Sequence, residues 1–171
     1  MADTVNIIVT GGIETGKTTV CRQLVQMARA DRVVCGGILT PLSNDGGKLV
    51  QDIASGAQVV LATRSGTGDG ITVGRYFMHR QGIEFGQSAI YAARNADVLI
   101  IDELGALELK GDGFASAIDI INEGGIKNVV MVIRSKYISR FRRLLTVDAT
   151  VFKVTMANRE KIVKNIYLSL R

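Results

Sequence analysis

The chain has 171 residues, 47% of them hydrophobic, 22% charged and one of them proline, and its formal net charge is +5. This length predicts one domain over residues 1–171 with a sizeable core, and the composition excludes a disordered or low-complexity chain. No apolar run approaches the ~20 residues that span a bilayer, and the first residues lead directly into an apolar strand, so we expect a cytosolic protein that does not cross a membrane.

The first predicted elements are a strand at residues 5–9 and a helix at residues 17–29, joined by a glycine-rich turn. Residues 11–18 fit the phosphate-loop pattern G-x-x-x-x-G-K-[ST], and both flanks have the type of structure that this pattern needs. Glycines let backbone N–H groups approach a triphosphate closely, and the helix adds its positive dipole end. Lys17 supplies a charge to the outer phosphates, and the Thr18 hydroxyl is an oxygen ligand suited to Mg²⁺. Nucleotide binding is therefore predicted.

A second strand is predicted at residues 33–39, after which the pattern changes. Short apolar pieces at 49–53, 59–62 and 71–77 are separated by clusters of Gly, Asn, Asp and Ser. Such turn clusters between short apolar runs are typical of hairpins. We therefore predict an antiparallel hairpin excursion at about residues 40–80, on the edge of a parallel core.

The next predicted helix ends near residues 95–97, and its apolar stripe is formed by Phe85, Ala89, Ala92, Ala93 and Ala96. It leads into residues 98–101, four consecutive apolar residues of the kind found in a strand that is covered on both faces. Asp102 and Glu103 follow at the carboxyl end of this strand, where ligands bind in open α/β sheets. Downstream of a phosphate loop, the pair predicts a second nucleotide motif, with Asp102 beside Mg²⁺ and Glu103 placed to orient and deprotonate an attacking water.

Two helices, two strands and an amphipathic segment are predicted in the rest of the chain. In order they are a helix that buries Phe114, Ala117, Ile118 and Ile121, a strand at 129–133, the amphipathic segment 136–145, a strand at 150–155, and a closing helix with Asn158 as its cap. Arg134 stands at the end of the strand 129–133, where it is placed to sense the outer phosphate; surface pairing is the alternative.

Positive charge is concentrated towards the C-terminal end. Residues 1–126 have 10 Lys/Arg and 14 Asp/Glu, a net charge of −4, whereas residues 127–171 have 11 Lys/Arg and 2 Asp/Glu, a net charge of +9. In the amphipathic segment the cations lie opposite an apolar side formed by Tyr137, Ile138, Phe141, Leu144 and Leu145. This basic region is interpreted either as a field that attracts a triphosphate or as a nucleic-acid surface.

Three groups of residues give the chain a family resemblance: residues 11–18, the stretch 102–109 and residues 155–159. With them the chain resembles a family of P-loop nucleoside-triphosphatases that includes the thermophilic and the cancer-related nucleoside-triphosphatases, over nearly its full length. Asp-Glu-Leu-Gly-Ala-Leu-Glu-Leu at 102–109 is similar to the family's Walker B signature. Ile13 and Glu14 depart from the family, which usually has a proline and a small hydrophobic residue inside its Walker A loop.

The resemblance implies an α/β fold: a RecA-like or AAA-like P-loop domain whose mainly parallel central sheet is flanked by helices. It also implies slow hydrolysis of ATP, GTP and other nucleoside triphosphates to the diphosphate and phosphate, with little base preference and with Mg²⁺ as the cofactor. Catalytic roles are predicted for Lys17, Glu103 and Arg134, and Mg²⁺ ligands at Thr18 and Asp102. The residues predicted to bind the nucleotide are Gly11, Gly12, Ile13, Glu14, Thr15, Gly16, Lys17, Thr18, Thr19, Asn158 and Arg159.

Two other functions stay open. A small-molecule or nucleotide kinase would use Arg134, Arg140, Arg142 and Arg143 as a lid, although Glu103 argues against it because activating water would waste the triphosphate. A nucleotide-dependent nucleic-acid-binding protein would use the basic region, although few aromatic residues are placed for base stacking. Metal sites built on histidine or cysteine are disfavoured, since His79 is alone and Cys21 and Cys35, predicted as reduced core thiols, have no C-x-x-C spacing.

Overall fold

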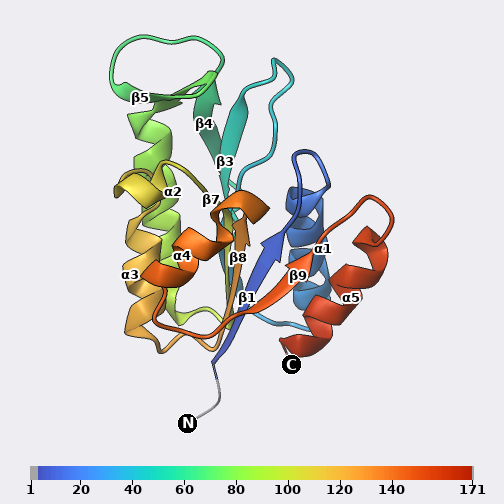
Figure 1. Ribbon diagram of the computed structural model, residues 1–171. Coiled ribbons are helices and arrows are strands. Elements are labelled where there is room, and N and C mark those ends of the chain that lie inside the picture. The colour runs from blue at the N-terminus through green and yellow to red at the C-terminus, as the bar shows by residue number, and fades with distance from the viewer. Residues whose placement is uncertain (1–3, 171) are drawn as a thin grey trace.

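The computed structural model describes residues 4–170, which form a nine-stranded sheet with helices on both faces (Figure 1). The strand order across the sheet is β5-β6-β4-β3-β2-β7-β8-β1-β9. The strands are β1 (Val5–Thr10), β2 (Cys35–Leu39), β3 (Lys48–Asp52), β4 (Gln58–Thr63), β5 (Gly70–Val73), β6 (Tyr76–His79), β7 (Val98–Leu104), β8 (Asn128–Ile133) and β9 (Thr150–Lys153). The α-helices are α1 (Lys17–Ala30), α2 (Arg80–Ala92), α3 (Ser116–Glu123), α4 (Ile138–Leu144) and α5 (Arg159–Ser169). The short 3-10 helices are η1 (Ala93–Asn95), η2 (Glu108–Lys110) and η3 (Ser135–Tyr137).

The sheet has a parallel part and an antiparallel part. β2, β7, β8, β1 and β9 run parallel to one another. β3, β4, β6 and β5 continue the sheet beyond β2 with antiparallel pairing. The mainly parallel core and the antiparallel excursion at about residues 40–80 are therefore confirmed. Because the parallel strands share one direction, their carboxyl ends meet at one edge of the sheet, at the top of Figure 1.

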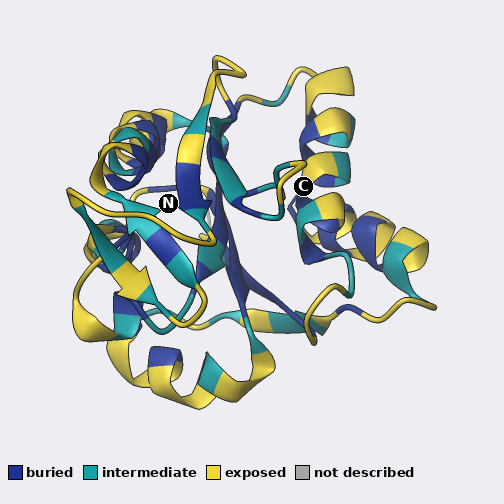
Figure 2. Ribbon diagram, turned by 90° about the horizontal axis from the view of Figure 1, so that it is seen from above, coloured by how far each residue is buried: buried dark blue, intermediate teal, exposed yellow. Residues whose placement is uncertain are grey.

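Successive side chains of the central strands point to opposite faces of the sheet, so the core has two parts, one on each face. Ile7 and Ile100 pack with α1 and α5, whereas Ile8 and Ile101 pack with α2, α3 and α4. All four are fully buried, as expected for parallel strands covered on both sides. Figure 2 shows these buried strands at the centre, between helices whose outer faces are exposed. The sheet is thus a rigid platform for whatever its edge carries.

The buried face of α2 differs from the predicted stripe. Ala89 and Ala93 are buried as expected, but Ala92 is exposed, and the buried face also contains Ile83 and Ile90 together with two glycines. A Cβ at Gly82 would lie 2.4 Å from the carbonyl oxygen of Val60, and one at Gly86 would lie equally close to a ring carbon of Phe114. The predicted stripe omitted Ile83 and Ile90, and a count of apolar side chains also overlooks glycines that allow two elements to approach closely.

Several predicted boundaries also shift. The strand expected at 33–39 begins at Cys35, and the strand expected at 150–155 ends at Lys153. β7 continues to Leu104, so Asp102 and Glu103 lie within the strand and not after it. The amphipathic segment 136–145 is divided between η3 and α4, and Leu144 is 42% exposed, although it was assigned to the apolar side.

Two further expectations concern compartment and cysteine chemistry. Both cysteines are free and buried, which confirms them as core thiols. Burial raises the pKa of both thiols, that of Cys35 to about 11. Within residues 4–170, no helix combines the length and the apolar character that crossing a bilayer requires. A cytosolic location stays a prediction.

Gly37→Ala tests how tightly β2 packs against β7. Gly37 has a φ of +103°, and a Cβ there would lie 2.0 Å from the backbone oxygen of Ile100. Gly56→Ala is the matched control, because Gly56 has a φ of +78° but a Cβ there would meet no described heavy atom beyond its chain neighbours within 4 Å. We expect Gly56→Ala to lower the free energy of unfolding by about 1 to 2 kcal/mol, and Gly37→Ala to lower it by at least about 2 kcal/mol more. Urea unfolding measures both; equal losses would show that β2 adjusts to the extra methyl group.

Candidate active site

The phosphate loop joins β1 to α1 at the carboxyl edge of the sheet. Gly16 precedes the helix with a φ of 94°, and its carbonyl oxygen accepts the first helical hydrogen bond, from the Val20 N–H at 2.9 Å. In the described part of the chain no side chain caps α1, and its first turn contains no acidic residue. The N–H groups of this turn and the positive end of the helix dipole therefore face the loop without a competing carboxylate.

Lys17 is the central cation of the site. Its side chain is only 8% exposed, and its Nζ donates hydrogen bonds to the carbonyl oxygens of Gly11, at 3.4 Å, and Gly12. Burial lowers the pKa of Lys17; Glu103 and Asp102 oppose this effect, while Arg134 and Lys48 add to it. The ammonium is thus held over the loop among two acids and two further cations that come from other strands.

Asp102 and Thr18, the two predicted Mg²⁺ ligands, are brought together. Asp102 is 1% exposed, and its Oδ2 accepts a hydrogen bond from the Thr40 N–H, just beyond the end of β2, at 3.1 Å. The pKa of the Asp102 carboxyl is raised by burial, against hydrogen bonds from Thr40 and the Thr18 hydroxyl that lower it. One buried carboxylate thus touches the hydroxyl at the start of α1, and β2 fixes its orientation.

Glu103 and Arg134 form an ion pair. Nε of Arg134 lies 2.8 Å from Oε1 of Glu103, and the side chains are 32% and 21% exposed, respectively. Arg134 follows β8 directly, and the neighbouring Ser135 hydroxyl lies 3.2 Å from that of Thr10 at the end of β1. Of the two placements considered for Arg134, the described residues put it against the acid at the centre of the site and not against an acid elsewhere on the surface.

Glu108 is a buried carboxylate that follows β7. It is 7% exposed, and its carboxylate accepts hydrogen bonds from the Gly105 N–H at 2.7 Å and the Phe114 N–H at 3.0 Å. Burial raises the pKa of Glu108, although both hydrogen bonds lower it. The side chain therefore fastens the loop that follows β7, two residues beyond Glu103.

Arg159 lies beside the phosphate loop, whereas Asn158 belongs to the turn before α5. A Cβ at Gly16 would lie 2.5 Å from Cδ of Arg159, so Arg159 covers the end of the loop. Asn158 occupies the cap position of α5, but its side chain does not cap the helix, which corrects that prediction. Its amide instead accepts from the Thr155 N–H at 2.8 Å and donates to the Lys153 carbonyl at 2.9 Å, so it orders the turn between β9 and α5.

The remaining loop residues are more open to solvent. Gly12, Ile13, Glu14 and Thr19 are exposed, Ile13 to 70%, while Thr15 donates its hydroxyl hydrogen to the Gly12 carbonyl at 3.1 Å. The acid at position 14 thus lies on an exposed part of the loop.

Lys48 is a site residue that the sequence did not identify. It begins β3, in the antiparallel part of the sheet, yet its charge acts on both Lys17 and Asp102. Its Nζ also lies 5.5 Å from the centre of the Tyr76 ring. No local sequence motif indicates Lys48, because only the pairing of β3 with β2 brings it to the edge of the sheet that holds the phosphate loop.

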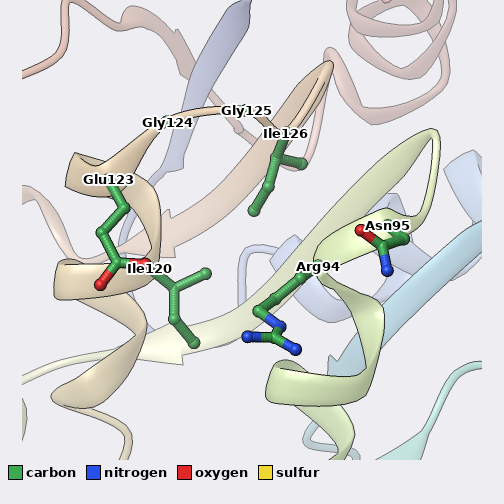
Figure 3. A pocket seen from close by; sticks show the side chains of 7 residues that line it. All are labelled: Arg94, Asn95, Ile120, Glu123, Gly124, Gly125 and Ile126. Carbon is green, nitrogen blue, oxygen red and sulfur yellow. The ribbon is translucent and has the colours of Figure 1, made fainter.

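None of these residues lines a pocket of about 360 Å³, which Figure 3 shows. It is lined by Arg94 and Asn95 of η1, by Ile120 and Glu123 of α3, and by Gly124, Gly125 and Ile126 before β8. These residues precede β7 and β8, at the amino ends of the parallel strands, so the pocket is at the opposite edge from the phosphate loop. Among the described residues, no three His, Cys, Asp or Glu side chains gather into a metal-binding group.

The whole chain is similar to known proteins. The family model described as NTPase matches residues 6–167. The nucleoside-triphosphatase THEP1 of Methanopyrus kandleri is 28% identical over 173 residues, covering 92% of this chain and 90% of that protein. The nucleoside-triphosphatase THEP1 of Thermofilum pendens is 32% identical over 164 residues, covering 91% and 89%.

Two solved structures have the same fold. The crystal structure of THEP1 from the hyperthermophile Aquifex aeolicus matches with a TM-score of 0.73 and 25% identity, over 95% of this chain and 96% of that one. The solution structure of a human cancer-related nucleoside triphosphatase matches with a TM-score of 0.77 and 24% identity, over 98% of both chains. The expected α/β architecture is therefore confirmed.

Glu108→Gln tests the buried carboxylate through pH. Because burial raises the pKa of Glu108, the folded chain binds this proton more tightly than the unfolded chain, and stability from this group falls as pH rises from below the unfolded pKa through the folded pKa. Glutamine keeps the shape and does not titrate. Between the unfolded and the folded pKa of Glu108, the free energy of unfolding of the wild type should therefore decline relative to that of the variant, by no more than about 1.4 kcal/mol per pH unit. Above the folded pKa, the difference between the two proteins should be constant. Urea unfolding at a series of pH values gives the two curves, and parallel curves would contradict the assignment.

Proposed function

Because this chain belongs to the NTPase family, we propose that it hydrolyses nucleoside triphosphates to the diphosphate and phosphate at the phosphate-loop site, with Mg²⁺ as cofactor. The observation that carries the proposal is the convergence of four groups at one sheet edge. Lys17 lies over the loop, Asp102 touches Thr18, and Glu103 stands next to Asp102 on β7. This combination serves triphosphate hydrolysis, because it offers phosphate charge neutralisation, a metal site and a base.

The residues at Asp102 fit a Mg²⁺ ion. A hydroxyl and a carboxylate supply two hard oxygen donors, and Mg²⁺ usually takes one or two protein ligands and completes its shell with water and phosphate. Asp102 is buried and already hydrogen-bonded to Thr40 and Thr18, so it is held in one orientation. When bound there, Mg²⁺ would neutralise charge on the outer phosphates.

The protein groups have separate roles in the reaction. Lys17 and the N–H groups of the loop stabilise negative charge on the transferred phosphoryl group. Glu103 accepts a proton from water as the water oxygen bonds to the terminal phosphorus and the bond from that phosphorus to the bridging oxygen breaks. Arg134 contacts the terminal phosphate. Thr19 and the other exposed loop residues contribute backbone contacts.

The turn before α5 supports low base preference. Both ends of the Asn158 amide are engaged with the backbone of Thr155 and Lys153. Each of these bonds uses one of the two positions at that end of the amide, so the Asn158 side chain is held in the turn. Arg159 offers a planar guanidinium, which stacks on any base alike.

The kinase and nucleic-acid alternatives receive no comparable support. Arg140, Arg142 and Arg143 are exposed, and α4 is fixed to the sheet by Phe141, which is fully buried. A lid needs a segment that moves, whereas this helix is anchored in the core. The arginines therefore act as a general positive field.

Lys17→Ala should remove most nucleotide affinity and turnover and leave the fold intact. The substitution deletes a buried ammonium that bonds only loop carbonyls among the described residues, so the free energy of unfolding without nucleotide should stay the same or rise. Lys164→Ala, exposed on α5, is the matched control for the lost charge. Calorimetric titration with Mg-ATP and a thermal melt measure the two effects, and a melting temperature well below that of the wild type would contradict this role.

Glu103→Gln and Asp102→Asn should separate chemistry from metal binding. Glutamine cannot accept the proton, so single-turnover hydrolysis should slow by about 10² to 10⁴, while Mg-ATP binding should not weaken. Asp102→Asn should weaken the part of ATP binding that depends on Mg²⁺, measured with and without EDTA. Near-normal hydrolysis by Glu103→Gln would rule out the base role and return the kinase and binding-protein alternatives to consideration.

A further inference from the structure

Glu103 is the shared counterion of two cations. Its Oε1 is 2.8 Å from Nε of Arg134, and it is the charged group with the largest effect on the pKa of Lys17. Arg134 acts on Lys17 in the opposite direction, as expected for two positive charges that approach each other. Without Glu103, this end of the sheet would hold a buried ammonium and a half-buried guanidinium that repel each other.

The ion pair with Arg134 engages the Glu103 carboxylate, which the proposed reaction needs as its base. A base must be free to accept a proton from water, yet Glu103 accepts a charge-assisted hydrogen bond from Arg134. A guanidinium has five N–H donors in a rigid fork and binds phosphate as readily as carboxylate. A triphosphate next to Lys17 therefore competes with Glu103 for Arg134.

We propose that Arg134 is exchanged between Glu103 and the terminal phosphate, so that binding of a triphosphate frees Glu103 to act as the base. This inference rests on the proposed function and adds an order of events to it. Before binding, Glu103 balances Lys17 and Arg134. On binding, the terminal phosphate takes over as their counterion, and Glu103 turns to the attacking water. A diphosphate has no terminal phosphoryl group to attract Arg134, so the ion pair persists with the product.

A double-mutant cycle on E103Q and R134Q tests the exchange by equilibrium binding. The E103Q side chain keeps the shape and still accepts a hydrogen bond from the Arg134 guanidinium, but it has no negative charge, so the pair loses its Coulomb attraction. E103Q should therefore bind Mg²⁺ and a non-hydrolysable triphosphate about three- to tenfold more tightly than the wild type. In the R134Q background the same change should have little effect. The affinity for Mg²⁺ and ADP should stay within about twofold throughout, because ADP does not compete for Arg134.

Loss of repulsion between Glu103 and the phosphates would also tighten binding, so a control is needed. Glu14→Gln removes an exposed acid from the phosphate loop, and Arg134 is paired with Glu103 instead. The effect of Glu14→Gln on triphosphate affinity should be the same in the wild-type and the R134Q backgrounds. If E103Q also has the same effect in both backgrounds, Glu103 acts by repulsion alone and the exchange is overturned.

Two further readouts separate the exchange from a purely structural role. The Nε–H proton resonance of Arg134 should shift on addition of the triphosphate analogue and remain unchanged with ADP; an equal response to both would contradict the exchange. R134K keeps the positive charge but loses the forked N–H donors of the guanidinium. Its coupling energy with E103Q should therefore lie between that of Arg134 and that of R134Q. The double-mutant cycle measures binding and requires no turnover. If the protein hydrolyses ATP but Glu103 and Arg134 show no coupling, the exchange alone is overturned. If the protein hydrolyses no triphosphate, the proposed function is overturned and the exchange with it.

Discussion

The buried ammonium of Lys17 is the interaction on which the site depends. A cation that is 8% exposed loses most of its hydration, and the fold offsets that loss with the loop carbonyls and the charges of Glu103 and Asp102. Each acid also has partners of its own: Thr40, Thr18 and the charge of Lys48 for Asp102, and Arg134 for Glu103. The site is therefore a balanced cluster in which adding a polyanion or removing one charge changes the state of all the others.

The sheet produces this cluster through the order of its strands. β1, which leads into the phosphate loop, lies beside β8, and β8 lies beside β7. Their carboxyl ends bring together Lys17, Arg134 and the pair Asp102 and Glu103, although these residues span more than a hundred positions of the chain. The antiparallel strands add Lys48 from the other side of β2. The buried central strands hold Lys17, Arg134 and the acid pair at one edge of the sheet, and the half-buried β3 holds Lys48.

Local patterns identified the parts of this site that local chemistry determines. The phosphate loop and the acid pair after an apolar run are short motifs, and the strands around them have strong apolar signals. Lys48, the anchoring role of Glu108 and the glycine face of α2 were not identified, because each depends on partners distant in the sequence or on the absence of a side chain. Arg134 was predictable only in part. Its position at the end of a strand follows from the sequence, but its ion pair with Glu103 depends on the pairing of β8 with β7.

In the proposed mechanism, the Glu103–Arg134 pair would also make turnover slow. A base that is held by a guanidinium until a triphosphate arrives is seldom free to activate water, so stray hydrolysis is suppressed whenever the site is incomplete. The same pair adds a barrier to each productive cycle, because a half-buried charge-assisted hydrogen bond must break before proton transfer. If Glu103 turned away from Arg134 permanently, Lys17 and Arg134 would lose the acid between them. Repulsion between these two cations would then destabilise the nucleotide-free protein. The ion pair thus links stability of the free protein to restraint of its chemistry.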